Sequence, residues 1–252
     1  FATFTSVVPF IIDARYPVLL RGRHGIGKST LVYQIAKERG LTIVERRASQ
    51  MTEGDLLGLP KVEGNVTKWL APEWLHQACN EPCVLFLDEV DRATTEVRQG
   101  IFELCDSRKI AGYQLHEDTV IFAAVNGGEH GAQYMVGEMD PAELDRYTVF
   151  DVEPSIEDWL GWAKGKIATE IWDFINNNHQ HLEHGGDFEP NKVYPSRRSW
   201  ERLSKTLVAS GQQIEDSPTL YHITTAFVGF EAAIAFNDYM KNYQRQVTIE
   251  NI

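Results

Sequence analysis

The sequence predicts an α/β domain built on a parallel sheet, followed by a smaller helical domain. Short β-branched and aliphatic runs recur between helical patterns in the first part of the chain, at residues 18–20, 43–44, 84–87, 120–125 and 149–150. Such runs, separated by helices, are typical of strands buried on both faces of a parallel five-stranded sheet. No further run follows about Glu153, so we expect an α/β domain over residues 1–152 and an all-helical lid domain over residues 153–252.

Helical patterns and turn residues place the remaining elements. A helix with one apolar side is expected between the first two strands, over residues 29–39, with Gly40 as its C-terminal stop. Glycine and proline between residues 183 and 195 predict a loop in the second domain. Helices are expected there at residues 156–163, 167–176, 199–209 and 220–243.

Composition narrows the class of protein. The 252 residues include 24 Lys and Arg against 36 Asp and Glu, a net charge of −12 that disfavours broad nucleic-acid binding. No run of eighteen or more apolar residues and no leader-like first segment is present, so we expect a cytoplasmic protein without membrane insertion. The cysteines show no CxxC spacing and predict reduced core residues rather than disulfides or a zinc site.

A phosphate-binding loop follows the first strand. The segment matches G-x-x-x-x-G-K-[ST] and consists of Gly22, Arg23, His24, Gly25, Ile26, Gly27, Lys28, Ser29 and Thr30. Its glycines let backbone amides turn toward phosphates, and the helix that follows points its positive end at them. Lys28 would neutralise phosphate charge and Ser29 would bind magnesium, so the loop predicts ATP and Mg²⁺ as cofactors. The alternative is a chance glycine-rich turn.

An acidic pair ends the apolar run at residues 83–87. Ligands gather at the carboxyl ends of parallel strands, so Asp88 and Glu89 should face the phosphate loop. Asp88 would hold magnesium, and Glu89 would act as general base on the attacking water. Taken alone, an apolar run followed by Asp and Glu is also a common surface exit.

These motifs resemble the AAA+ ATPases, and the later segments look like the MoxR-like branch of that superfamily. Residues 120–126 form an apolar run ending in Asn126, similar to the sensor 1 of the family, which orients water or contacts the γ-phosphate. The alternative is a purely structural role, in which Asn126 caps the turn before Gly127 and Gly128. The resemblance implies the AAA+ core and a helical lid, with ATP hydrolysis as the activity.

Two arginines receive roles from the resemblance. Residues 142–147 look like the L-D-R-F box, which makes Arg146 the arginine finger that reaches a neighbouring subunit's site and stabilises charge on the γ-phosphate. An ordinary surface arginine is the alternative. Residues 195–200 are similar to the sensor 2 segment and assign that role to Arg198, although Arg197 stands where the family has proline and leaves the choice between them open.

The segment at residues 54–69 looks like the helix-2 insert of MoxR-like proteins. Residues 61–69 predict a hairpin with Gly64 and Asn65 at its turn. In the family such inserts face the pore of a ring, so Lys61, Lys68 and Trp69 could contact a partner, but a hairpin that covers its own domain is the alternative.

The resemblance implies a homo-oligomer, a hexameric ring, that acts as a chaperone-like remodelling motor. The expected partner is a protein on another chain, and MoxR-like proteins often act with a partner that carries a von Willebrand A domain. Three other hypotheses stay open: a nucleotide-dependent scaffold with little turnover, a nucleic-acid remodelling ATPase of the helicase-loader type, and a small-molecule P-loop kinase.

Overall fold

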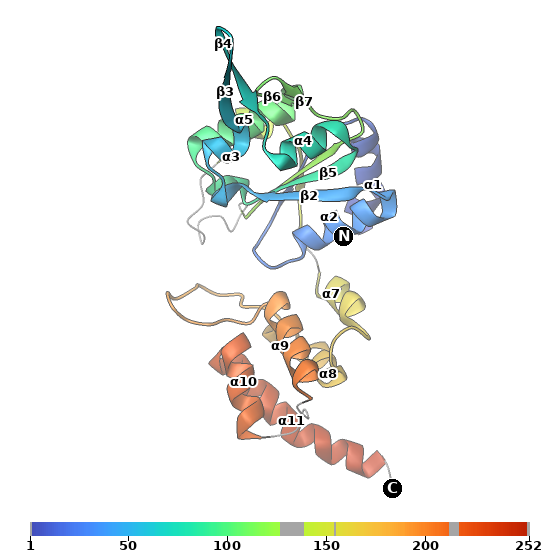
Figure 1. The fold of residues 1–252 in the computed structure, drawn as a ribbon. Coiled ribbons are helices and arrows are strands. Elements are labelled where there is room, and N and C mark those ends of the chain that lie inside the picture. Colours follow the sequence, from blue (N-terminus) through green and yellow to red (C-terminus); the bar gives the residue numbers. More distant parts are fainter. Residues whose placement is uncertain (1, 127–138, 154, 212–216, 251–252) are drawn as a thin grey trace. The chain divides into compact units, whose positions relative to one another are not determined.

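The computed structural model describes residues 2–126, 139–153, 155–211 and 217–250 (Figure 1). The chain separates into two compact units, Phe1–Glu153 and Pro154–Ile252. The division lies one residue from the one expected at 152/153.

Unit 1 contains a parallel five-stranded sheet in the order β2-β5-β8-β1-β9, which confirms the predicted fold class. Each strand coincides with one of the five apolar runs. The strands are β1 (Val18–Arg21), β2 (Thr42–Arg47), β5 (Cys83–Asp88), β8 (Val120–Val125) and β9 (Thr148–Asp151). Because β2 and β9 are the edges, the ends of β5, β8 and β1 lie side by side in the middle of the sheet.

Side chains alternate between the two faces of the sheet and enter two cores. Leu20, Phe86 and Phe122 pack on one face with helices α1 (Ala2–Asp13) and α2 (Lys28–Arg39). Leu19 and Leu85 pack on the other face with helices α3 (Glu53–Leu57), α4 (Glu73–Asn80) and α5 (Thr95–Ser107). Buried on both faces, the strands are continuous apolar runs, and this is why the sequence revealed them.

Short elements complete unit 1. The predicted hairpin is present as β3 (Leu59–Glu63) and β4 (Val66–Leu70) and projects from the rest of the unit (Figure 1). The 3-10 turns η1 (Ala48–Gln50) and η2 (Val90–Arg92) follow β2 and β5, and α6 (Pro141–Leu144) precedes β9. A second small hairpin, β6 (Lys109–Ile110) and β7 (Tyr113–Gln114), follows α5.

Unit 2 is helical in its described residues, around a core that includes Trp200, Phe174 and Phe236. Its elements are α7 (Ile156–Ala163), α8 (Thr169–Asn177), η4 (His179–His181), α9 (Arg197–Ser210), α10 (Pro218–Val228) and α11 (Phe230–Glu250). The loop predicted between residues 183 and 195 is confirmed.

The single helix expected over residues 220–243 is wrong, because the chain breaks at Gly229 between α10 and α11. Gly229 has φ +82°, and a Cβ there would lie 2.1 Å from the carbonyl oxygen of Val193. Only glycine accommodates that backbone and that contact. The 183–195 loop therefore packs into the break.

Among the helices of the described residues, none is both long enough and apolar enough to cross a membrane.

Candidate functional site

The sheet order brings the predicted loop and acidic pair together at the carboxyl ends of the strands, called the carboxyl edge below. The loop follows β1, Asp88 ends β5, and Asn126 follows β8, which lies between those two strands. The amide of Gly22 donates to the carbonyl of Val125 across 3.3 Å, which joins the start of the loop to the end of β8. The carboxyl edge of the central strands therefore holds most of the predicted site.

The phosphate loop has a backbone that requires glycine. Gly25 and Gly27 have φ values of 78° and 99°, in the left-handed region. A Cβ on Gly22 would lie 2.5 Å from the carbonyl oxygen of Val152, so the loop is packed closely against the chain after β9. Ile26 is buried in the core while His24 is exposed, so the loop offers its backbone rather than these side chains.

Lys28 is the centre of the site. Its side chain is buried, and the ammonium Nζ donates to the carbonyls of Gly22 at 2.7 Å and Arg23 at 2.9 Å. Nζ also donates to Oδ1 of Asn126 at 2.8 Å. A buried ammonium is costly unless it is bonded, so these contacts hold the charge inside the loop and tie it to the end of β8.

Asp88 ends β5, the strand beyond β8, and Glu89 follows it directly. Burial raises the pKa of Asp88, the amide of Glu89 opposes the rise by donating to Oδ1 at 2.9 Å, and the neighbouring charge of Glu89 adds to it. Lys28 lowers the same pKa through its charge. A cation bound at Asp88 would likewise favour the charged carboxylate.

Glu89 has an unusual backbone and a defined side-chain partner. Its φ of 56° lies in the left-handed region, which costs a non-glycine residue roughly 1–2 kcal/mol. Its Oε2 accepts a hydrogen bond from Oγ of Ser49 at 2.5 Å. Ser49 lies in η1, directly after β2, the neighbour of β5. Ser49 therefore restrains the predicted general base.

Asp91, like Ser49, is a site residue that the motifs did not identify. It is 3% exposed, and its Oδ2 accepts from the backbone amide of Asn126 at 2.9 Å. Burial raises its pKa, and the bond to Asn126 opposes the rise. Asp91 thus fixes the backbone that carries the amide side chain bonded to Lys28. The turn expected at Gly127 and Gly128 lies outside the described residues.

Arg146 lies near the amino ends of the strands, called the amino edge below, and so at the opposite end of the sheet from the phosphate loop. Thr148 pairs with Val18 at the start of β1, whereas the phosphate loop leaves the end of β1 after Arg21. The length of these strands alone separates the two edges by roughly 10 Å. Nη1 of Arg146 donates to the carbonyl of Ala142 at 2.5 Å. The structure therefore does not bring Arg146 to Lys28 and Asn126 of its own chain.

The two candidate arginines of unit 2 have different surroundings. Arg197 is buried, and its guanidinium donates to Glu183 at 3.2 Å and to the carbonyl of Ser155 at 3.0 Å. Arg198 is exposed on the next position of α9. The buried bonds give Arg197 a structural role within unit 2, and the sensor 2 role of Arg198 stays a prediction.

The side chains at the carboxyl edge fit a magnesium-bound nucleoside triphosphate. Lys28 and the first turn of α2 supply positive charge and amide donors for phosphates. The hydroxyl of Ser29, the second residue of α2, and the carboxylate of Asp88 are the hard oxygen ligands that Mg²⁺ prefers. The close contact at Gly22 leaves no room there for a side chain that would cover the loop.

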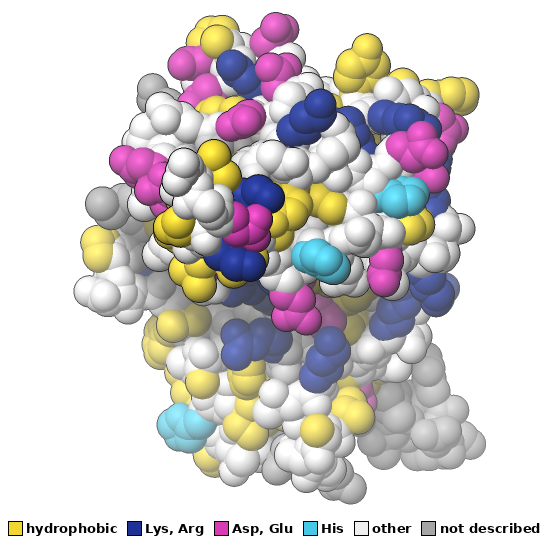
Figure 2. Space-filling model, turned by 45° about the horizontal axis from the view of Figure 1, so that its top comes forward, with side chains coloured by type: hydrophobic (Ala, Val, Ile, Leu, Met, Phe, Trp, Pro, Cys, Tyr) yellow, Lys and Arg dark blue, Asp and Glu magenta, His cyan; other side chains and the backbone are white. Residues whose placement is uncertain are grey.

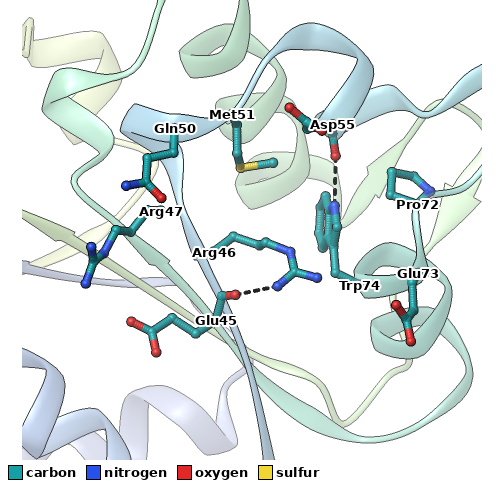
Figure 3. A pocket seen from close by; sticks show the side chains of 9 residues that line it. All are labelled: Glu45, Arg46, Arg47, Gln50, Met51, Asp55, Pro72, Glu73 and Trp74. Carbon is teal, nitrogen blue, oxygen red and sulfur yellow. Dashed lines mark hydrogen bonds between the residues drawn. The ribbon is translucent and has the colours of Figure 1, made fainter.

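A separate cavity of about 610 Å³ lies beside the edge strand β2 (Figure 3). Arg46 extends into it and donates to the carbonyl of Glu45 at 2.8 Å, and Trp74 forms a wall fixed by a 2.8 Å bond to the carbonyl of Asp55. Its lining contains none of the predicted site residues. The cavity thus shares no residue with the carboxyl-edge site, although Arg47 in its lining pairs with Asp88 in the sheet.

Comparison with known proteins identifies relatives of the sequence. Residues 17–147 match the AAA domain family, dynein-related subfamily. The chain is 36% identical over 249 residues to midasin of Giardia intestinalis, covering 94% of this chain and 5% of that protein. It is 30% identical over 106 residues to the nuclear valosin-containing protein-like protein of Mus musculus, covering 37% of this chain and 12% of that protein. The chain therefore spans only a small part of each relative.

Solved structures share the fold. The RuvB Holliday junction branch migration motor of Thermotoga maritima superposes with a TM-score of 0.52 at 14% identity, covering 95% of this chain and 67% of that one. NtrX of Brucella abortus in complex with ADP gives a TM-score of 0.52 at 14% identity, covering 85% of this chain and 50% of that one. At this identity the likeness concerns the fold alone.

Proposed function

Because this chain belongs to the dynein-related subfamily of the AAA domain family, we propose that it binds and hydrolyses Mg-ATP to remodel a partner protein. One observation carries the proposal. The buried ammonium of Lys28 joins the phosphate loop to Asn126, and the carboxylates of Asp88 and Glu89 follow on the adjacent strand. This is the charge arrangement that phosphoryl transfer to water requires.

Each side chain takes one part of the reaction. Lys28 and the loop amides hold the phosphates, and Ser29 and Asp88 hold the magnesium ion, which supplies charge neutralisation when bound. Glu89 accepts a proton from the attacking water, and Asn126 orients that water. The ADP held by NtrX, a protein of the same fold, supports nucleotide as the ligand class.

The position of Arg146 favours a site shared between neighbouring AAA modules. At the amino edge of the sheet, its guanidinium can meet the triphosphate of an adjacent module rather than its own. A closed ring repeats such a head-to-tail contact, and by resemblance the ring has six members. The neighbours are copies of this chain. In each, Arg198 links nucleotide state to the helical unit.

The exposed hairpin supports a protein partner. Leu59, Val62 and Val66 are 69%, 74% and 56% exposed on β3 and β4. Leu59 and Val66 lie on one face of the hairpin and Val62 on the other, so both faces expose apolar side chains, as surfaces that contact another protein often do. We extend the proposal to the MoxR-like branch, in which the partner carries a von Willebrand A domain.

Charge distribution does not favour nucleic acid as the substrate. On the face presented in Figure 2, lysine and arginine side chains lie in separate groups with acidic side chains between them. The net charge of −12 adds repulsion from phosphates. DNA-stimulated hydrolysis that raised salt removes would support the helicase-loader alternative instead.

The test of hydrolysis is release of free phosphate from Mg-ATP without any acceptor. We expect Glu89→Gln to lower kcat on the order of a hundredfold or more while Mg-ATP binding persists, because the base is lost but the phosphate contacts stay. Glu103→Gln, on the exposed side of α5, is the matched control and should keep wild-type turnover. A wild-type chain that binds ATP without releasing phosphate, at high concentration and with a partner, would establish the scaffold alternative.

The test of the shared site is turnover against protein concentration. Wild-type activity per chain should rise with concentration as neighbours assemble, and Arg146→Ala should remove that rise without weakening Mg-ATP binding. Activity per chain that stays constant on dilution and survives Arg146→Ala would show a self-sufficient site.

A further inference from the structure

The ring of Phe102 lies under two guanidinium groups. The Cζ atom of Arg146 is 5.8 Å from the ring centroid, and that of Arg98 is 6.0 Å from it. Phe102 is 6% exposed in α5, and its ring and that of Tyr147 pack nearly perpendicular at 6.2 Å between centroids. An aromatic ring held this firmly offers a fixed face to the cations beside it.

Arg98 also ties α5 to the segment that carries Arg146. Its Nη2 donates to Oε2 of Glu143 at 2.6 Å, and both side chains are largely buried, at 15% and 20% exposure. The same Oε2 accepts a hydrogen bond of 3.1 Å from the backbone amide of Asp140, as part of the capping box of α6. Glu143 therefore fixes the short helix that ends two residues before Arg146.

An arginine finger needs this kind of support. A half-exposed arginine loses side-chain entropy when it is held in one geometry. Contacts that already restrict the guanidinium reduce the loss that accompanies the reaction. In the described residues, Arg146 contacts both the ring of Phe102 and the carbonyl of Ala142.

We propose that Phe102 is a positioning residue that directs the guanidinium of Arg146 toward the nucleotide of the adjoining module, while the Arg98–Glu143 pair holds the segment in place. The inference rests on the proposed shared site. It extends that proposal from the arginine that contacts the phosphate to the aromatic ring that orients it. If the ring served only the core, turnover at a neighbour's site would not depend on keeping its aromatic face.

Mixing two inactive variants isolates this effect. A chain with Lys28→Ala lacks its own site but offers Arg146, and a chain with Arg146→Ala keeps its site but lacks the arginine. Mixed together, they should regain Mg-ATP hydrolysis at the sites of the second chain. Phe102→Leu, Phe102→Tyr or Phe227→Leu is then added to the first chain only. Phe227 is the matched control, because Arg202 lies 5.6 Å from its ring in unit 2.

We expect Phe102→Leu in the first chain to lower the restored kcat about three- to tenfold, with an unchanged KM for ATP. Phe102→Tyr, which keeps the aromatic face, should restore kcat to within about twofold, and Phe227→Leu should have no effect. Thermal unfolding of each first-chain variant confirms that it is folded.

Two results would overturn the inference, and they are distinguishable. If Phe102→Leu restores turnover as fully as its parent, or if Phe102→Tyr is as defective as Phe102→Leu, the ring is structural only. If the Lys28→Ala parent itself never restores turnover at any mixing ratio, the shared site is wrong, and the role of Phe102 falls with it.

Discussion

The two edges of the five-stranded sheet hold their charged groups in opposite settings. At the carboxyl edge, Lys28 and Asp91 are buried and bonded to neighbouring backbone or side chains. At the amino edge, Arg146 is half-exposed and rests on an aromatic ring. The first arrangement is closed within one chain, and the second presents a cation outward.

The two settings suit different parts of the chemistry. A site that binds phosphate benefits from groups fixed by their own fold, because their positions cost nothing further when ligand arrives. A group that serves a neighbour must be displayed and yet restricted. Removing a phosphate contact at the carboxyl edge should therefore weaken binding, whereas substitutions at the amino edge should change turnover alone.

The largest effect is expected from Lys28→Ala, which would break the carboxyl edge. Removing the ammonium that joins the loop to Asn126 should weaken Mg-ATP binding by at least about a hundredfold, since hydrogen bonds to buried charges contribute strongly. Isothermal titration calorimetry measures it. Lys37→Ala, exposed on the same helix, is the control. Binding that survives Lys28→Ala would contradict the assignment of the loop.

A smaller effect, confined to turnover, should follow from Arg146→Lys. Lysine keeps the charge but lacks the planar fork and stacks less well on Phe102, so kcat should fall roughly thirty- to a hundredfold while the Kd for Mg-ATP stays constant. Steady-state kinetics and calorimetry separate the two quantities. Arg202→Lys, an arginine that also lies over a phenylalanine, should behave as wild type. A weakened Kd would show that Arg146 binds the nucleotide of its own chain.

Asn126→Ala should lower kcat by about tenfold and weaken Mg-ATP binding only a few-fold. The amide oxygen that Lys28 contacts is lost, while the backbone bond to Asp91 remains. Single-turnover measurements report the chemical step directly. Asn80→Ala, on the exposed end of α4, is the control. Unchanged single-turnover rates would leave Asn126 a structural cap.

The smallest effect is a change in how stability depends on pH in Asp91→Asn. Burial raises the pKa of Asp91, so the folded chain holds this proton more tightly than the unfolded chain does. The contribution of Asp91 to wild-type stability therefore decreases as the pH rises from 3.8, its ordinary pKa, through its raised pKa in the folded chain. The introduced amide does not titrate but can still accept from Asn126. The stability of wild type relative to the variant should thus decline over that window and stay level above it.

Urea unfolding at a series of pH values measures this difference. Asp106→Asn, exposed near the end of α5, is the comparison variant, which should leave that dependence on pH intact. A relative stability of wild type that is constant or rises over the same window would show that burial does not control Asp91.

The sequence was informative where one local pattern determines structure. Strands buried on both faces appear as apolar runs, and the glycines of the loop at residues 22–27 follow from a backbone that other residues resist. Because parallel strands share a carboxyl edge, the meeting of Lys28 and Asn126 also follows from the motif order. The first helix was missed, although Phe4, Val8 and Ile12 recur at intervals of four.

Contacts between distant segments were beyond local patterns. Ser49 reaches Glu89 because β2 pairs with β5 and the chain then turns into η1, which no spacing in the sequence encodes. The bond between Asp91 and Asn126 depends on the same packing. At Gly229 the helical pattern continues on both sides, and the break arises from a contact with the Val193 backbone, 36 residues away.

The root of the β3–β4 hairpin is fixed at several points. A Cβ on Gly58 would lie 1.9 Å from the carbonyl oxygen of Leu70, and the hydroxyl of Tyr113 donates to the carbonyl of Trp69 at 2.6 Å. Beyond this root the strands extend roughly 16 Å. The hairpin is thus held rigidly at its base. A small tilt of α3 or α4 would therefore produce a larger displacement at its tip, at Gly64 and Asn65.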